Sequence, residues 1–326
     1  MNITHKIASA PILLPSVFTY LSLLNYQKSV EDTQAENLAA TDLSLAVDND
    51  IDAVQLYMAN DSLFDSLKQV SAIEKLINIF GIKFPALNYE KALDIFQKWI
   101  EAKTVNQVCI VNVHTLVNSL KDKELESICN NAMSTMDGVP LVWYSNLIAN
   151  AGLDTNVCGP DLMLKCIDEG RDKGWKHYFL GSTDEVLHDL VDVMHNRYPG
   201  ADIVGWYSPP FRSLSDQEDQ QIVDLINVAE PHFLWVSLGA PKQEKWIAHH
   251  LHRINVPVQL GVGAAFSFHS GHISRAPVWM QKSGFEWLYR MLKERRLFKR
   301  YLSSNPVFLA IFIKDFVSSK IKRFSL

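Results

Sequence analysis

The stretch HFLWVSLGAPKQEKWI, residues 232 to 247, carries the clearest sign of the chain's architecture. Its first half is a nearly continuous apolar run, as expected of a strand buried on both faces of a parallel sheet. Gly-Ala-Pro at 239–241 ends the run, and Lys242, Gln243 and Glu244 then open a segment with helical spacing. A plain strand-to-helix turn needs only a breaker and a cap. Because ligands bind beyond the carboxyl ends of the strands in open α/β sheets, this cation, amide and carboxylate predict a binding edge.

Apolar runs alternate with helical segments in the same way from Ile79 to Gly263. The pattern predicts strands at 107–113, 176–181, 201–207, 232–238 and 256–263. It predicts helices at 89–102, 114–132, 160–174, 183–200 and 215–231, and another after 241. Ser215 and Glu218 have the spacing of a capping box at the start of one of these helices. Strands separated by helices form a parallel sheet with helices on both faces, so we predict an α/β, Rossmann-like fold.

Three regions of the chain differ in composition. Residues 1–77 are an N-terminal extension that we expect to be mostly helical or irregular, residues 78–280 are the α/β core, and residues 281–326 are a basic helical appendage. Within the extension, residues 7–24 are apolar enough to suggest a weak signal or anchor segment. Two prolines break this stretch and a strongly basic leader is missing, so we do not expect secretion.

The charge is unevenly distributed. The whole chain carries a formal net charge of -5, but residues 282–326 hold eleven Lys or Arg against three Asp or Glu, a local charge of +8 that leaves -13 for the rest. The overall acidity argues against a general nucleic-acid binder. Cys109, Cys129, Cys158 and Cys166 lack metal-type spacing, and Cys109 falls in a predicted buried strand. We therefore expect reduced thiols in a cytoplasmic protein.

Polar residues recur where the predicted strands or turns end. Asn112 and His114 leave the strand at 107–113, Asp137 precedes a glycine turn, and Asp161 stands near the start of a helix. Gly181 closes another strand, where backbone N–H groups would be free to bind a phosphate. Each has a structural alternative: Asp137 belongs to a simple turn, Asp161 caps its helix, and His114 bonds to the backbone.

The opening stretch has a structural alternative too. Lys242 and Glu244 would then be a solvated helix start, although Gln243 between them has no structural reason to be an amide. The sequence lacks Walker A, GxGxxG, HExxH and GxSxG patterns, so an oxidoreductase with a dinucleotide loop is a poor interpretation.

The appendage mixes arginines with aromatic residues. Arg290, Arg296 and Arg300 recur near helical spacing, which suits a surface that binds phosphates or an anionic membrane. Further on, Phe308, Phe312 and Phe316 share one helical face. Two interpretations stay open for that face: it enters the membrane interface, or it packs on the protein's own core or on another subunit.

Taken in order, several segments resemble the WecG/TagA/CpsF family of bacterial glycosyltransferases. The resemblance covers about residues 78 to 310 and rests on VNVHTLVNSLKD, MDGVPLVW, GPDLM, YFLGSTDEV, VSLGAPKQEKWI and RAPVWMQKSGFEWLYR. It implies an inverting, metal-independent enzyme without a cofactor, peripheral on the inner face of the cytoplasmic membrane. Its donor would be a UDP-sugar carrying N-acetylmannosamine, the corresponding uronic acid or a glucose-type hexose, and its acceptor a polyprenyl-diphosphate-linked glycan. A homo-oligomer is also compatible with the family.

The resemblance also assigns roles to residues. Asp137 would be the general base, Gln243 would lie near the donor sugar or diphosphate, and the appendage arginines would neutralise the leaving UDP in place of a metal. The full set that we assign to the substrates is Asn112, His114, Asp161, Gly181, Gly239, Lys242, Gly263, Arg290, Arg296 and Arg300.

Four positions depart from the family's usual residues: Ile110, His114, Asn156 and Ser267. None of these departures removes Asp137 or Gln243, so we expect an active enzyme with an altered donor preference. The alternative is a catalytically silent protein of the same pathway that binds a UDP-sugar or acts as a scaffold.

Overall fold

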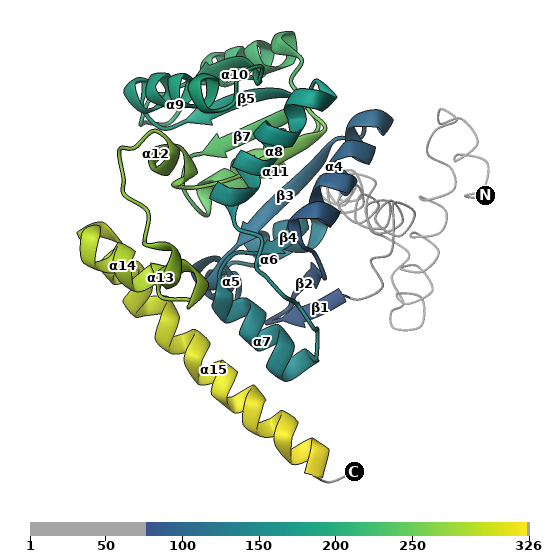
Figure 1. Ribbon diagram of the computed structural model, residues 1–326, viewed down its shortest axis with the longest axis vertical. Helices are drawn as coiled ribbons and strands as arrows, with labels where there is room; N and C mark the ends of the chain where they lie inside the picture. The colour runs from purple at the N-terminus through teal and green to yellow at the C-terminus, as the bar shows by residue number, and fades with distance from the viewer. Residues whose placement is uncertain (1–75, 325–326) are drawn as a thin grey trace, which may run out of the picture. The chain divides into compact units, whose positions relative to one another are not determined.

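The computed structural model describes residues 76–324, and the predicted N-terminal extension, including residues 7–24, lies outside them except for its last two residues (Figure 1). Its centre is a six-stranded sheet with the order β4-β3-β8-β7-β5-β6, in which all neighbours pair in parallel. The strands are β3 (Asn106–Val111), β4 (Met133–Met136), β5 (Lys176–Gly181), β6 (Asp202–Tyr207), β7 (Phe233–Ser237) and β8 (Val258–Gly261). The predicted α/β, Rossmann-like fold is confirmed.

The helices that follow or connect the strands include α4 (Tyr89–Ala102), α5 (Val113–Ser119), α6 (Lys123–Asn131), α8 (Gly159–Lys173), α9 (Asp184–Arg197), α10 (Asp216–Ala229), α11 (Lys242–His250) and α12 (Ala265–His269). The predicted capping box is present, because the Ser215 hydroxyl accepts from the Glu218 N–H while the Glu218 carboxylate accepts from the Ser215 N–H. The segment at 114–132 forms two helices rather than one, because Asp122 caps a new helix with its side chain.

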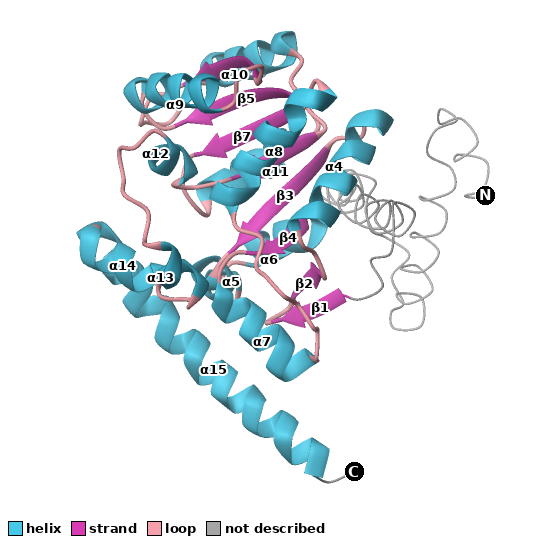
Figure 2. Cartoon of the chain, viewed as in Figure 1, coloured by secondary structure: helices cyan, strands magenta, loops and turns pink. Residues whose placement is uncertain are grey.

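The helices form two layers, one on each face of the sheet (Figures 1 and 2). Alternate strand residues divide between these layers. In β3, Val108 and Ile110 pack in the cluster that contains residues of α4, α8, α9 and α12, whereas Cys109 and Val111 pack with residues of α5 and α6. Helices α10 and α11 cover the latter face farther along, packing on β5 and β7.

This layering places a crevice between β3 and β8. The two strands are neighbours, but α5 follows β3 on one face while α12 follows β8 on the opposite face. The chain therefore diverges at their carboxyl ends, and in open α/β sheets ligands bind at such a point.

Strand β4 is absent from the sequence-based prediction. Its four residues, Met133 to Met136, include two hydroxyl side chains that do not read as a buried strand. In the fold both hydroxyls are satisfied, since Ser134 donates to the Cys129 carbonyl at 2.7 Å and Thr135 donates to the Val157 carbonyl at 3.1 Å. A buried polar group is tolerated when its hydrogen bond is made.

The remaining elements lie beside the β4 edge. An antiparallel hairpin joins β1 (Leu76–Ile79) to β2 (Ile82–Pro85), so the described fold begins just before the predicted boundary at 78. Helix α7 (Val139–Ala149) follows β4. The predicted helical appendage consists of α13 (Val278–Lys282), α14 (Glu286–Lys293), η1 (Arg295–Leu297) and α15 (Phe298–Phe324).

Helix α15 packs on α5 and α7, and this corrects one interpretation of its aromatic face. Phe308 is 6% exposed and lies in the core cluster with Tyr144. Phe312 also packs against Tyr144, and Phe316 contacts Phe312. Phe308 and Phe312 therefore do not enter a membrane interface, because they dock the appendage on the core. No helix among residues 76–324 combines the length and apolar character needed to cross a bilayer.

Candidate active site

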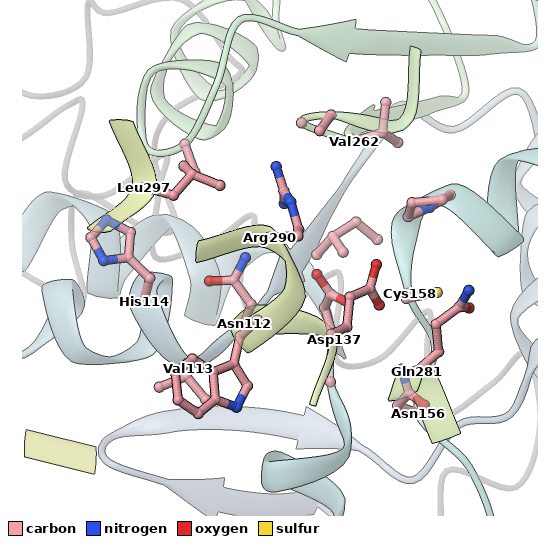
Figure 3. Close-up of a pocket in the computed structure, with 18 of the residues that line it drawn as sticks. Asn112, Val113, His114, Asp137, Asn156, Cys158, Val262, Gln281, Arg290 and Leu297 are labelled. Atoms are coloured by element: carbon pink, nitrogen blue, oxygen red, sulfur yellow. The ribbon is translucent and has the colours of Figure 1, made fainter. Parts of the chain in front are cut away.

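A cavity of about 890 Å³ lies at the carboxyl ends of the strands. Its wall runs from Asp137 after β4, past Asn112 after β3 and Val262 after β8, to Ser237 in β7 and Ser182 after β5. Residues of α14, η1 and α15 cover it from the appendage side. Figure 3 shows Arg290 and Leu297 of the appendage facing Asn112, His114 and Asp137 of the core. The volume is typical of a site for a small molecule.

Asp137 is positioned by both of its neighbours in the chain. Its N–H donates to the Val111 carbonyl at 2.8 Å, which extends the pairing of β4 with β3 by one residue. Gly138 then adopts a φ of 111°, a conformation that favours glycine, and α7 begins at the next residue. This turn leaves the side chain at the cavity wall, where, within residues 76–324, its carboxylate accepts no hydrogen bond.

The surroundings of Asp137 make it a stronger base than an ordinary aspartate. Desolvation, followed by the negative charge of Glu286, raises its pKa to about 6, and this outweighs the opposing charges of Arg275, Arg290 and Arg300. The group is therefore ionised at neutral pH, but its pKa is much closer to the working range than an ordinary aspartate's.

Asn112 and His114 lie together at the start of α5. The Asn112 Oδ1 caps the helix by accepting from the Thr115 N–H at 3.0 Å, and an Arg300 Nη2 approaches the same oxygen at 3.5 Å. His114 bonds to the Asn118 amide at 3.0 Å through Nε2. Burial and the charge of Arg300 lower the pKa of His114 to about 4, so the ring is neutral at physiological pH. His114 therefore bonds to a side chain, not to the backbone.

Gln243 has a structural reason to be an amide, contrary to the sequence-based expectation. Its Oε1 accepts from the Gly263 N–H at 3.1 Å, and its Nε2 donates to the Glu244 carboxylate at 3.0 Å. The side chain lies flat over Gly261, where an added Cβ would come within 2.7 Å of it. Gln243 borders the cavity and holds the loop after β8 in place. Glu244 is only 1% exposed, so it does not belong to a solvated helix start.

Asp161 is an ion-pair partner and not a helix cap. The cap position of α8 is Cys158, whose side chain makes no capping hydrogen bond to the helix backbone, and Asp161 lies inside the first turn. Both terminal nitrogens of Arg275 donate to its two carboxylate oxygens, and the Cys158 thiol donates to it at 3.0 Å. The Nε of Arg275 also reaches Glu286 at 3.4 Å. Arg275 thus connects α8 to the appendage.

The three appendage arginines border the cavity but differ in their partners. Arg290 pairs with Glu294 at 2.9 Å and lies over the Phe268 ring, and Arg296 pairs with the same Glu294 at 2.7 Å. Arg300 makes no ion pair within residues 76–324, and its buried Nε has no hydrogen-bond partner there. A mostly buried, unpaired guanidinium is a favourable place for an anionic group of a ligand.

The other predicted site residues divide into two groups. Gly239 and Gly263 border the cavity. Gly181 pairs with Ser237 at the end of β5, and Lys242 is exposed at the start of α11; neither borders it. Of the four departures from the family pattern, Ile110, His114, Asn156 and Ser267 all border the cavity, so each is placed to affect ligand binding.

Sequence reasoning did not assign Tyr89, Ser182, Phe211, Arg275 or Glu286 to the site, although all five border the cavity. Arg275 and Glu286 belong to the motif RAPVWMQKSGFEWLYR, which is the only signal that pointed to them. No group of three or more His, Cys, Asp or Glu side chains in the described part of the chain is arranged to hold a metal ion.

Comparison with known proteins identifies the family of the chain. The model of the WecG/TagA/CpsF glycosyltransferase family matches residues 77–322. An N-acetylglucosaminyldiphosphoundecaprenol N-acetyl-beta-D-mannosaminyltransferase of Bacillus subtilis is 27% identical over 227 residues, which cover 69% of this chain and 86% of that protein. A protein of the same name from Staphylococcus aureus is 27% identical over 236 residues, 72% of this chain and 90% of its own. The chain belongs to the WecG/TagA/CpsF family of glycosyltransferases.

Proposed function

We propose that the protein transfers an N-acetylmannosamine-type sugar from its UDP conjugate to a polyprenyl-diphosphate-linked glycan, with inversion at the anomeric carbon. The observation that carries this proposal is the Asp137 carboxylate, unpartnered within residues 76–324, in a cavity bordered by Arg290, Arg296 and Arg300. A base beside several cations suits a reaction in which a hydroxyl loses a proton while a diphosphate departs.

The substrate classes come from the relatives. Their names specify transfer of an N-acetylmannosaminyl group to N-acetylglucosaminyldiphosphoundecaprenol. The shared family and the similar length of the matched region favour the same kind of donor and acceptor here. The corresponding uronic acid and a glucose-type hexose are the other candidates, because the four departures from the family's usual residues border the cavity.

In the proposed reaction the acceptor hydroxyl oxygen attacks the anomeric carbon from the side opposite the diphosphate. The new C–O bond forms as the bond from that carbon to the UDP oxygen breaks, and Asp137 takes the hydroxyl proton. Because its pKa is about 6, most of Asp137 is in the ionised form at neutral pH and is able to accept the proton.

Cationic side chains, rather than a metal ion, are proposed to neutralise the leaving UDP. Arg300 suits this role because its buried Nε is unpartnered within the described residues. Arg290 and Arg296 share Glu294 as their partner, so a single carboxylate is divided between two cations at this side of the cavity. Gln243 acts indirectly in this scheme, by positioning the Gly263 loop.

The appendage is also proposed to dock on the inner face of the cytoplasmic membrane. Because Phe308 and Phe312 pack on the core, the opposite face of α15 is the part available to lipid. It exposes Leu302, Ile313 and Val317. The local charge of +8 adds attraction to anionic lipids, and each basic residue near such a surface contributes about 1 kcal/mol. A lipid-linked acceptor would be met at that surface.

The proposal is tested by measuring UDP release from a panel of UDP-sugars, with and without lipid-linked acceptors. We expect release from UDP-N-acetylmannosamine that depends on a lipid-diphosphate acceptor ending in N-acetylglucosamine. Turnover with a different UDP-sugar alone would revise the donor. A protein that binds UDP but transfers from no donor would favour the alternative, a catalytically silent sugar-nucleotide-binding or scaffold protein.

A further inference from the structure

One part of the cavity lies where α7, the loop between α13 and α14, and α15 come together. It is bordered by Trp143 of α7, Lys282 at the end of α13 and Leu309 of α15. A Cβ added to Gly284 would lie 3.3 Å from the Trp143 ring, so the α13–α14 loop packs directly on α7. Helix α7 begins two residues after Asp137, so this part of the cavity leads away from the proposed base.

The face of α15 that borders the cavity changes in polarity along the helix. Tyr301, Asn305 and Leu309 are spaced four residues apart, so their side chains share one face over roughly 12 Å of helix. All three border the cavity, and so do Phe308 and Phe312 beside Leu309. Within residues 76–324, neither the Tyr301 hydroxyl nor the Asn305 amide makes a hydrogen bond. The cavity face of α15 therefore offers hydrogen-bonding groups near its start and apolar side chains farther along.

The polar end of this face is the end near Asp137. Burial is the largest influence on the pKa of Tyr301 and raises it, while Arg290 and Arg300 oppose the rise. The charge of Asp137 also acts on this hydroxyl, so Tyr301 lies near both the proposed base and the arginines. A ligand that reaches Asp137 along α15 therefore passes apolar side chains first and hydrogen-bonding groups last.

A lipid-linked acceptor has the same order of polarity. Its sugar carries hydroxyls, two phosphates follow, and a hydrocarbon chain completes the molecule. In an inverting transfer the attacking hydroxyl and the departing diphosphate lie on opposite sides of the anomeric carbon. Figure 3 shows Arg290 and Gln281 on different sides of Asp137, and Gln281 belongs to α13, as Lys282 does. With the leaving UDP at the arginines, the side of the cavity next to α13 and α7 is left for the acceptor.

Lys282 supplies a positive charge in this part of the cavity. It borders the cavity at the end of α13 and makes no ion pair within residues 76–324. Arg275, by contrast, already pairs with Asp161 and Glu286. A cation without an internal partner, next to apolar side chains, suits an anionic group that is attached to a hydrocarbon chain.

We propose that this part of the cavity is the acceptor subsite. The acceptor sugar is bound by Tyr301 and Asn305, its diphosphate by Lys282, and the first units of its lipid chain by Trp143 and Leu309. This inference rests on the proposed function, since it assumes a lipid-linked acceptor. The lipid chain then contributes to acceptor binding through direct contacts with the protein, separately from any docking of the appendage on a membrane.

The test measures acceptor-dependent UDP release by the full chain in detergent, without vesicles, so that membrane docking plays no part. Two acceptors carry the same sugar diphosphate, one on a polyprenyl chain and the other on a short alkyl chain. We expect the unaltered protein to have a lower KM for the polyprenyl acceptor. Leu309→Gln should raise that KM about tenfold, as expected when one leucine side chain loses its apolar contact, and should leave the KM values for the short acceptor and the UDP-sugar unchanged.

The controls separate lost contacts from disturbed folding. Leu309 is 54% exposed, so Leu309→Gln should fold normally, and Leu309→Met should behave as the unaltered protein does. Leu225→Gln, at a 49% exposed residue of α10 that does not border the cavity, should leave all three KM values unchanged. Lys282→Gln should raise the KM for both acceptors, because both carry the diphosphate, without changing the KM for the UDP-sugar. Lys282→Arg should restore both values.

Equal KM values of the unaltered protein for the two acceptors would overturn the inference. So would a Leu309→Gln variant whose KM rises equally for both acceptors or not at all, or a Lys282→Gln variant whose KM rises for the UDP-sugar. In each of these cases acceptor-dependent UDP release persists, so the proposed function stands and only the subsite fails. If the unaltered protein releases no UDP with either acceptor, the proposed function fails and the inference fails with it.

Discussion

Among single residues, Asp137 decides whether the site contains a general base or only binds a ligand. Its pKa is raised to about 6 chiefly by desolvation, and next by the negative charge of Glu286. Glu286 comes from the appendage and is held there by Arg275. The appendage therefore adjusts the base as well as covering it.

This coupling predicts the pH dependence of transfer. A general base must be ionised, so kcat/KM should fall about tenfold per pH unit below about pH 6. Glu286→Gln removes a charge that favours the protonated form of Asp137. The pKa of Asp137 then falls, and the acid limb of the pH–rate profile should move to lower pH.

The profile is measured with saturating acceptor for the unaltered protein and for Glu286→Gln, with Glu124→Gln as the control. Glu124 is exposed on α6, pairs with Lys245 and His249, and does not border the cavity. An acid limb that stays in place, or moves to higher pH, in Glu286→Gln would contradict the electrostatic account of Asp137.

The predictability of the site from sequence also differs by residue. Asp137, Asn112 and Asp161 were identified because each stands at the end of a strand or a turn, where polar side chains are conspicuous. Arg275 was missed because its role depends on contacts between segments distant in the chain. The Arg275–Asp161 pair joins residues 114 positions apart, and periodicity carries no information on such a pairing. Gln243 was predicted to contact the ligand, but its hydrogen bond to the Gly263 backbone could be recognised only in the folded structure.

Among the elements, α15 connects the appendage to the core. Its inner face docks through Phe308 and Phe312 against Tyr144, and the Tyr144 hydroxyl donates to Asp315 at 2.6 Å. Arg300 lies near the start of the same helix and reaches Asn112. Docking of α15 therefore determines where this cation lies relative to the base.

Substitutions on the docked face and on the exposed face of α15 should have different effects on stability. Phe308→Ala removes a buried ring, so the free energy of unfolding should fall by about 3–5 kcal/mol. Ile313→Ala, on the exposed face, should change it by less than about 0.5 kcal/mol. Urea denaturation of both variants checks this, and equal effects would mean that α15 does not dock through its aromatic face.

The elements show why the fold could be predicted in part. Continuous apolar runs or flanking turn residues mark five of the strands, so the sequence pattern was enough to predict them: β3, β5, β6, β7 and β8. The four-residue strand β4 and the β1–β2 hairpin were missed because short strands leave little periodicity, and because the β4 hydroxyls find partners only in the folded chain. The sequence also did not decide what the aromatic face of α15 contacts. An apolar face on one side of a helix is equally compatible with a membrane interface and with a protein core.

In the whole molecule, the charge asymmetry is concentrated at the appendage. Residues 282–326 carry +8 while the remaining residues carry -13, so only one part of the chain is attracted to anionic lipid. The exposed stripe of α15 lies in this same region. Membrane docking should therefore combine charge with modest apolar insertion and should be reversible.

Vesicle flotation tests this arrangement. The full chain should float with vesicles that contain anionic lipid and much less with neutral vesicles, and added salt should weaken the association because charge contributes to it. The double variant Ile313→Glu and Val317→Glu should float poorly at any salt concentration. Flotation of the double variant at the level of the unaltered protein would rule out the exposed face of α15 as the docking surface.

The central claim is that Asp137 is the base of a sugar transfer. The measurement that tests it most directly is the initial rate of acceptor-dependent UDP release by Asp137→Asn, which keeps the size of the side chain and removes its basicity. The account predicts UDP binding within about twofold of the unaltered protein, with turnover reduced by about 10²- to 10⁴-fold. Turnover close to that of the unaltered protein, with UDP binding intact, would contradict the assignment of Asp137.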